Sequence, residues 1–311
     1  MNWGRSLVAA TVVVAGWGCG SGGGETSRST ESLGCSDRLL DSSVTHAELE
    51  HDGQMRSYEI HVPPGYDGAE PFPVVLNFHG FTNDGLRHQT DSNMDATADE
   101  KGFIAVYPNG LFNSWNGGTC CGNAMTMDVD DVGFTRAVID DLAERGCIDE
   151  ARVYATGMSN GGFFSHRLGC EAADVIAASA PVAGVLGSDT ECTPARPIPI
   201  MHLHGTEDPL VPYDGVGGLT ESPSVDESID GWLARNGCTG EPEVTYQNGD
   251  ATCETVDQCD GDASVTLCRI EGAGHCWPGQ PCRMLGDLGE PTTDIDANEA
   301  MWGLFSTVEL R

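Results

Sequence analysis

The segment RVYATGMSNGG contains a serine with one glycine two residues before it and another two residues after it. Gly157, Ser159 and Gly161 form a G-x-S-x-G pattern, which a strand-like stretch (152–157) precedes and a helical pattern from residue 162 follows. A strand–turn–helix of this kind exposes a serine hydroxyl above a sheet, at the N-terminus of a helix. Such a hydroxyl can attack a carbonyl carbon once a base takes its proton, so Ser159 is the candidate nucleophile.

A serine nucleophile needs a base and an acid, and both occur further along the chain. Asp208 follows the strand-like stretch 198–205, and His275 follows the stretch 264–270. Loops of this kind meet at the carboxyl ends of the strands of a parallel sheet. The order serine, acid, histidine is that of α/β-hydrolases. We therefore expect Asp208 to orient His275, and His275 to carry the proton.

Other carboxylates and histidines compete for these two roles. Glu207 adjoins Asp208, and Asp214 lies just beyond it; we expect Glu207 to be a solvated neighbour. His275 is the only histidine that follows Asp208 in the sequence. Structural, hydrogen-bonded roles are expected for three histidines in or at the ends of strands: His79, His202 and His204.

An oxyanion hole needs two N–H donors beside the nucleophile. The backbone of Asn160, directly after Ser159, is expected to supply one, and the loop after the strand that ends at His79-Gly80 the other. We assign this second donor to Phe81, with Thr82 as the alternative. Two tryptophans lie in loops near the expected site, where they can either bind substrate or pack the loops: Trp115 and Trp277.

Strand-like and helix-like segments alternate from residue 35 onward, which predicts an α/β fold with a mostly parallel sheet and helices on both faces. One helix is expected over 131–146, where Phe134, Val138 and Leu142 recur every four residues before Gly146. Two further helical patterns occupy 162–175 and 294–308. The expected strands are 57–62, 73–80, 103–108, 152–157, 177–182, 198–205 and 264–270.

Eight segments together resemble the secreted polyhydroxybutyrate-depolymerase-like esterases, which overlap the feruloyl and acetylxylan esterases of carbohydrate esterase family one. The resemblance extends from about residue 57 to the end of the chain. The segments are NFHGFTND (77–84), VYPNG (106–110), SWNGGTCCG (114–122), VDDVGFTRAVIDDL (129–142), CIDEARVYATGMSNGG (147–162), HLHGTEDPLVPY (202–213), GAGHCWPG (272–279) and TDIDANEAMWGLF (293–305).

This resemblance implies an α/β-hydrolase fold and ester hydrolysis by Ser159, Asp208 and His275, without a metal or other cofactor. Met158 and Asn160, which flank the nucleophile, resemble feruloyl-type members more than polymer depolymerases. The expected substrates are thus feruloyl or acetyl esters of plant polysaccharides, with polyhydroxybutyrate or short hydroxyalkanoate esters as the alternative. A non-catalytic surface binding protein and a peptidase are the competing functions from other classes.

Thirteen cysteines indicate an oxidising compartment, and twelve remain if Cys19 is set aside. No C-x-x-C pair occurs, so disulfides are favoured over zinc sites. Cys276 and Cys282 are expected to pair and to close the loop that carries His275. The adjacent cysteines 120 and 121 are expected either to pair with each other or to join distant partners such as Cys147.

Residues 1–18 predict an export signal, because a positive start is followed by a short apolar stretch. Cys19 and the Gly/Ser-rich residues 20–34 then resemble a lipoprotein signal with a flexible tether, with a simple secretory signal as the alternative. Lipidation of Cys19 would attach the protein to a membrane, for example the outer membrane. Residues 35–311 are expected to form a single catalytic domain.

The acidic charge is the most unusual property of the composition. Asp and Glu number 48 against 15 Lys and Arg, for a formal net charge of −33, and Lys101 is the only lysine. A surface of this sign repels phosphate backbones, which disfavours nucleic-acid partners, and it also disfavours anionic polymer substrates.

Overall fold

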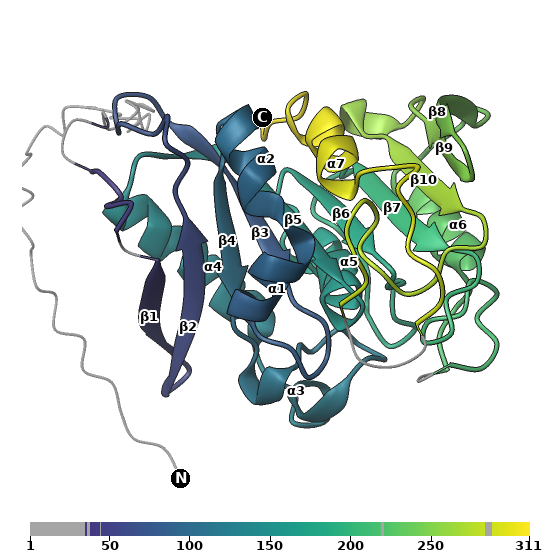
Figure 1. Cartoon of the computed structure of the whole chain (residues 1–311), viewed down its shortest axis with the longest axis horizontal. Helices are drawn as coiled ribbons and strands as arrows, with labels where there is room; N and C mark the ends of the chain where they lie inside the picture. The colour runs from purple at the N-terminus through teal and green to yellow at the C-terminus, as the bar shows by residue number, and fades with distance from the viewer. Residues whose placement is uncertain (1–34, 36–37, 44, 219–220, 284–287) are drawn as a thin grey trace, which may run out of the picture. The chain divides into compact units, whose positions relative to one another are not determined.

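Six short strands rich in β-branched and alanine residues form the parallel centre of the sheet in a computed structural model of the chain. The structure describes residues 35, 38–43, 45–218, 221–283 and 288–311. Ten strands form one sheet in the order β1-β2-β4-β3-β5-β6-β7-β10-β9-β8 (Figure 1). Pairing is parallel from β4 to β10 and antiparallel at both margins. The predicted α/β-hydrolase fold is confirmed.

Every predicted strand is present, with ends that differ by a few residues. The strands are β1 His46–His51, β2 Gln54–His61, β3 Phe72–Phe78, β4 Ile104–Pro108, β5 Ile148–Met158, β6 Ala178–Val182, β7 Ile200–Gly205, β8 Glu243–Asn248, β9 Ala251–Val256 and β10 Val265–Ile270. Strands β1, β8 and β9, which lie in the antiparallel margins, were not predicted from the sequence.

The three predicted helices correspond to α4, α5 and α7, and four further helices occur. The helices are α1 Gly85–Ser92, α2 Met94–Lys101, α3 Gly122–Thr126, α4 Asp131–Arg145, α5 Asn160–Glu171, α6 Val225–Arg235 and α7 Ala297–Phe305. Two short 3-10 helices add Leu111–Asn113 and Asp260–Asp262.

Helices cover both faces of the sheet because the parallel strands are apolar on both sides. In β3, Val74 and Leu76 pack into the core cluster that α4, α5 and α6 complete. Val75, between them, points to the opposite cluster, which α2 and α7 complete. In Figure 1, α1, α2 and α7 lie in front of the sheet. Two apolar cores therefore hold the central strands between them.

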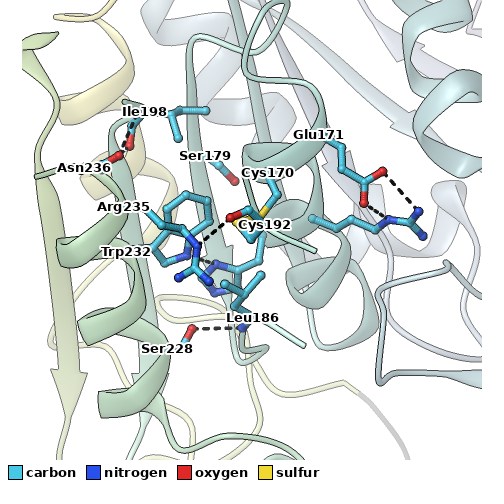
Figure 2. The surroundings of a disulfide bond; sticks show 12 residues. Cys170, Glu171, Ser179, Leu186, Cys192, Ile198, Ser228, Trp232, Arg235 and Asn236 are labelled. Carbon is cyan, nitrogen blue, oxygen red and sulfur yellow. Dashed lines mark hydrogen bonds and ion pairs between the residues drawn. A yellow bond between two sulfur atoms is a disulfide. The ribbon is translucent and has the colours of Figure 1, made fainter. Parts of the chain in front are cut away.

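Six disulfides use all twelve cysteines other than Cys19, and Cys276 pairs with Cys282 as predicted. Cys120 pairs with its neighbour Cys121, while Cys147 joins Cys35 across 112 residues. The remaining bonds are Cys170–Cys192, Cys238–Cys259 and Cys253–Cys268. Figure 2 shows the Cys170–Cys192 bond, with Arg235 of α6 donating a hydrogen bond to the Cys192 carbonyl.

The predicted export signal, the tether and Cys19 lie outside the described residues. Within those residues, no helix combines the length and apolar character that a membrane crossing requires. Residues 35–311 separate from the N-terminal segment as one unit.

Candidate active site

A sharp turn between β5 and α5 carries the candidate nucleophile. Ser159 has backbone angles of φ 57° and ψ −121°, a strained region for a residue with a side chain. The flanking glycines permit this turn because its backbone packs directly on the end of β3. A Cβ at Gly157 would lie 2.6 Å from the carbonyl oxygen of Phe78, and one at Gly161 would lie closer still to the same atom. Glycines at these two positions therefore meet a packing requirement.

Two backbone N–H groups beside Ser159 are the candidates for the predicted oxyanion hole. Asn160 is the first residue of α5, so its N–H has no acceptor within the helix. The loop after β3 lies against the nucleophile, since a Cβ on Gly80 would be 3.4 Å from that of Ser159. Thr82 donates its N–H to the Asn113 carbonyl at 2.8 Å. The N–H of Phe81 has no described acceptor, which favours Phe81 over Thr82 as the second donor.

The Asn160 side chain connects the turn to a neighbouring loop. Its carbonyl oxygen accepts the N–H of Trp115 at 2.7 Å, and its amide donates to the Trp115 carbonyl at 2.9 Å. This pair of bonds fixes the position of α5 at the residue next to Ser159.

The loops after β7 and β10 bring Asp208 and His275 together. His275 Nδ1 lies 2.6 Å from Asp208 Oδ2, and both side chains are fully buried. The other oxygen, Asp208 Oδ1, accepts the N–H groups of Leu210 and Val211, each at 2.8 Å. Burial alone would raise the pKa of Asp208, but these hydrogen bonds and the nearby histidines outweigh it and lower the pKa. Glu207 is exposed and takes no part in the contact.

The second ring nitrogen of His275 is available for proton transfer. Nε2 is buried and has no hydrogen-bond partner among the described residues. A carboxylate acceptor at Nδ1 holds a neutral imidazole in the tautomer whose free base is Nε2. Gly80 and Met158, which flank Ser159 in space and in sequence, line one small cavity together with His275. The unpartnered Nε2 therefore lies beside a cavity whose lining includes Met158, the residue directly before Ser159.

His79 supports the oxyanion loop, in agreement with the structural role expected for it. Its Nδ1 donates to the Gly80 carbonyl at 2.8 Å, and its Nε2 accepts the N–H of Gly110 at 3.0 Å. Burial lowers the pKa of His79 to about 4, which keeps the ring neutral near pH 7. It acts as a fixed bridge between two loops.

The two tryptophans are more buried than a substrate platform requires. Trp115 is fully buried, stacks on Phe164 with ring centroids 5.3 Å apart, and donates its Nε1–H to the His79 carbonyl. This favours the packing alternative for Trp115. Trp277 is also buried but lines the cavity beside His275, with its Nε1–H bonded to Asn298.

Two hollows are lined by residues next to the candidate site. The cavity at His275 has a volume of only about 20 Å³, and its lining includes Gly80, Met158 and Trp277. An open hollow of about 250 Å³ lies between the loops that carry Phe81 and Phe112, and both rings are exposed there. Phe112 was not predicted from the sequence, because a lone aromatic residue in a loop has no periodicity that distinguishes an exposed ring from a buried one.

No group of three or more His, Cys, Asp or Glu side chains within the part of the chain that the structure describes could hold a metal ion.

Comparison with known sequences identifies esterases. Feruloyl esterase B of Piromyces equi is 34% identical over 236 residues, which are 71% of this chain and 42% of that protein. The chain belongs to the esterase family that includes feruloyl and acetylxylan esterases. A bifunctional acetylxylan esterase/xylanase of Neocallimastix patriciarum is 29% identical over 70% of this chain and 31% of its own length. The chain thus spans less than half the length of these two members, and no family model matches it.

Solved structures support the fold of this esterase family. The acetyl xylan esterase from Aspergillus awamori superposes with a TM-score of 0.59 over 84% of this chain and 99% of its own, at 16% identity. A thermostable esterase gives a TM-score of 0.54 over 85% of this chain and 62% of its own, also at 16% identity. Identities this low show a shared fold.

Proposed function

We propose that the chain is a serine esterase that hydrolyses carboxylic esters through Ser159, His275 and Asp208. One observation carries the proposal: the buried bond between His275 and Asp208 leaves His275 Nε2 without a partner, in the cavity that Gly80 and Met158 also line. Membership of the esterase family supports the same chemistry.

The first half of the reaction would form an acyl-enzyme. Ser159 Oγ attacks the ester carbonyl carbon while its proton passes to His275 Nε2. The resulting oxyanion accepts hydrogen bonds from the N–H groups of Phe81 and Asn160. His275 then returns the proton to the alcohol oxygen as the carbon–oxygen bond breaks. Asp208 stabilises the protonated imidazole throughout.

The second half would release the acid. A water molecule gives its proton to His275 and attacks the acyl carbon, and the tetrahedral intermediate collapses with the proton returned to Ser159 Oγ. The residues named supply every proton transfer, so the proposed reaction uses no cofactor.

For the substrate we propose small acyl esters of plant polysaccharides, with acetyl ahead of feruloyl. A cavity of about 20 Å³ has room for roughly one water molecule, which fits a methyl group better than a phenolic ring. The exposed rings of Phe81 and Phe112 could lie against the face of a sugar in the open hollow. Short hydroxyalkanoate esters remain the alternative.

We also propose an extracellular location. Six disulfides are typical of an oxidising compartment. The predicted export signal supports the same location, and Cys19 would carry the lipid if the protein is anchored. Mass analysis of the N-terminus of the exported protein would distinguish a lipidated Cys19 from simple cleavage.

The test is hydrolysis by the purified protein and by Ser159→Ala. We expect a folded variant with kcat lowered on the order of 10⁴-fold, because the nucleophile is lost. Acetylated xylan, methyl ferulate, a 3-hydroxybutyrate ester and a peptide anilide form the substrate panel. Wild-type turnover in Ser159→Ala would refute the mechanism. If a fluorophosphonate probe does not label the wild-type protein, the chain is a binding protein. If the wild-type protein cleaves only the peptide anilide, it is a peptidase.

A further inference from the structure

Three buried histidines outside the candidate triad form one continuous line of hydrogen bonds. Trp232 Nε1 donates to His166 Nδ1 at 2.9 Å. His166 Nε2 lies 3.0 Å from His202 Nδ1, and His202 Nε2 lies 3.0 Å from His204 Nδ1. His204 Nε2 lies 2.8 Å from the carbonyl oxygen of Val211. We call His166, His202 and His204 the histidine chain.

The two ends of the histidine chain determine where every proton lies. An indole N–H can only donate, so His166 Nδ1 must accept, and a neutral His166 then carries its proton on Nε2. His202 Nδ1 then accepts from His166 Nε2, and His204 Nδ1 accepts from His202 Nε2, so both of these rings also carry their proton on Nε2. A carbonyl oxygen can only accept, so reasoning backward from Val211 gives the same tautomers. Each of the three rings thus has both nitrogens in use, with Nε2 as the donor.

The rings are held in this neutral state by burial. Burial lowers the pKa of His166 to about 3 and lowers those of His202 and His204 as well. The other titratable or charged groups next to the line are few: Asp208 and His275 at one end, Arg235 over the Trp232 ring at the other, and Tyr213 edge-on to His204. Neither the Trp232 indole nor the Val211 carbonyl exchanges protons with the histidines. The histidine chain therefore cannot serve as a proton path.

The histidine chain links the three elements that surround the acid. His166 lies on α5, the helix that begins directly after Ser159, while His202 and His204 lie on β7, which leads into Asp208. Trp232 belongs to α6 and packs against α5 beside the Cys170–Cys192 bond (Figure 2). Side chains within the core therefore join α5, which follows Ser159, to β7, which leads into Asp208.

The histidine chain ends at the loop of residues 208–211, which carries Asp208. His204 Nε2 bonds to the Val211 carbonyl, and the Val211 N–H bonds to Asp208 Oδ1, so both backbone groups of Val211 are fixed. His204 Nε2 also lies 3.5 Å from Asp208 Oδ2, the oxygen that His275 contacts. All four N–H bonds of the line point toward Asp208, and aligned hydrogen bonds polarise one another.

We propose that the histidine chain is a positioning unit for the acid: its aligned N–H groups fix the 208–211 loop and stabilise ionised Asp208 in the orientation that His275 needs. This inference rests on the proposed triad. Its three members are positioning residues, since none of them contacts Ser159 or lines the cavity at His275.

Side-chain NMR of the wild-type protein labelled with 15N-histidine tests the geometry without reference to activity. We expect His166, His202 and His204 to show the Nε2–H tautomer at neutral pH. Because burial lowers the pKa of His166 to about 3, its ring should not titrate between about pH 8 and pH 5. Trp232→Phe should shift the His166 Nδ1 resonance and leave the tautomers unchanged, because Val211 still sets their direction. An Nδ1–H tautomer at any of the three rings would overturn the proposal.

Kinetics of His204→Leu and His204→Gln test the positioning role. Losing the N–H beside a buried carboxylate should lower kcat about 10- to 100-fold with little change in KM. Glutamine can place an N–H near the position of Nε2, so we expect it to restore most of kcat. Tyr58→Phe removes a buried hydroxyl bond to Asp141, far along the sheet from the site, and should lower the melting temperature while kcat stays unchanged.

The outcomes separate this proposal from the proposed function. A folded His204→Leu with wild-type kcat would overturn the positioning role even if Ser159→Ala is inactive. An active Ser159→Ala would refute the triad, while NMR would still show whether the chain of tautomers exists. If His204→Leu does not fold, the tautomers of the wild-type protein and the kcat of His204→Gln still test the positioning role.

Discussion

Asp208 and Glu207 are adjacent in the loop after β7, but their side chains lie in different environments. Asp208 is buried, with Oδ2 facing His275 and Oδ1 accepting two backbone N–H groups, whereas Glu207 is exposed. Backbone N–H donors at one oxygen leave the other oxygen free to face the imidazole. The division between the two oxygens makes Asp208 the better candidate to orient the ring.

We predict that Asp208→Asn lowers kcat on the order of 10⁴-fold with a much smaller change in KM. Asparagine retains the size of the side chain but loses the charge that stabilises protonated His275. The measurement is steady-state hydrolysis of a small acetyl ester.

Glu207→Gln is the matched control for this substitution, because it makes the same chemical change one residue away at an exposed position. It should leave kcat within about twofold. A severe loss in Glu207→Gln together with a mild effect of Asp208→Asn would show that the acid is misassigned, although the serine–histidine pair could still hold.

The loop after β10 holds His275 by packing on the segment at Leu288 and Gly289. A Cβ at Gly274 would meet the backbone of Gly289 at 2.5 Å, so the loop after β10 packs closely on the segment that returns to it. The His275 N–H donates to the Leu288 carbonyl at 2.6 Å, and Cys276 is bonded to Cys282. The position of the base therefore depends on closure of this loop.

We predict that Cys276→Ser/Cys282→Ser lowers both stability and kcat. Releasing a loop of this length costs about 2 kcal/mol of unfolding free energy in the chain-entropy model. This corresponds to a fall of roughly 5 °C in melting temperature for a protein of this size. Calorimetry and steady-state kinetics measure the two effects.

Cys253→Ser/Cys268→Ser provides the comparison, since that disulfide joins β9 to β10 within the sheet. We expect this variant to lose stability while kcat is retained. Equal losses of kcat in the two double variants would show that the Cys276–Cys282 bond has no specific effect on the site.

Across the whole molecule, the surface combines a strongly acidic charge with a local exposure of aromatic rings. The net charge of −33 keeps anionic polymers away from the surface and leaves neutral esters unaffected. Phe81 and Phe112, in the loops after β3 and β4, are 38% and 46% exposed, whereas Trp115 and Trp277 are buried. These two properties are consistent with the proposed uncharged polysaccharide ester as substrate.

We predict that Phe112→Ala raises KM for acetylated xylan about threefold to tenfold, from the loss of one ring against a sugar face. The increase for 4-nitrophenyl acetate should be smaller, because that ester is too short to extend along the hollow. Parallel kinetics with both esters check the difference. A uniform rise in KM, or none, would contradict a role of the hollow in polymer binding.

The elements found from the sequence were those whose pattern is local. The buried parallel strands and the amphipathic helix α4 have apolar residues at a regular period. The edge strand β8 has six exposed residues, so no alternation identified it, and β9 was missed with it. Edge strands are determined by the neighbour they pair with, which lies elsewhere in the chain.

The sequence by itself determined the strand–turn–helix at Ser159, the chain order of Asp208 and His275, and the short Cys276–Cys282 loop. In each case the information lies in a few consecutive residues or in the order of the chain. Only the tertiary structure decided that Trp115 is buried, that Cys35 joins Cys147, and that the histidine chain connects α5 to β7. These contacts join residues 36 to 112 positions apart, and long-range packing alone brings them within bonding distance.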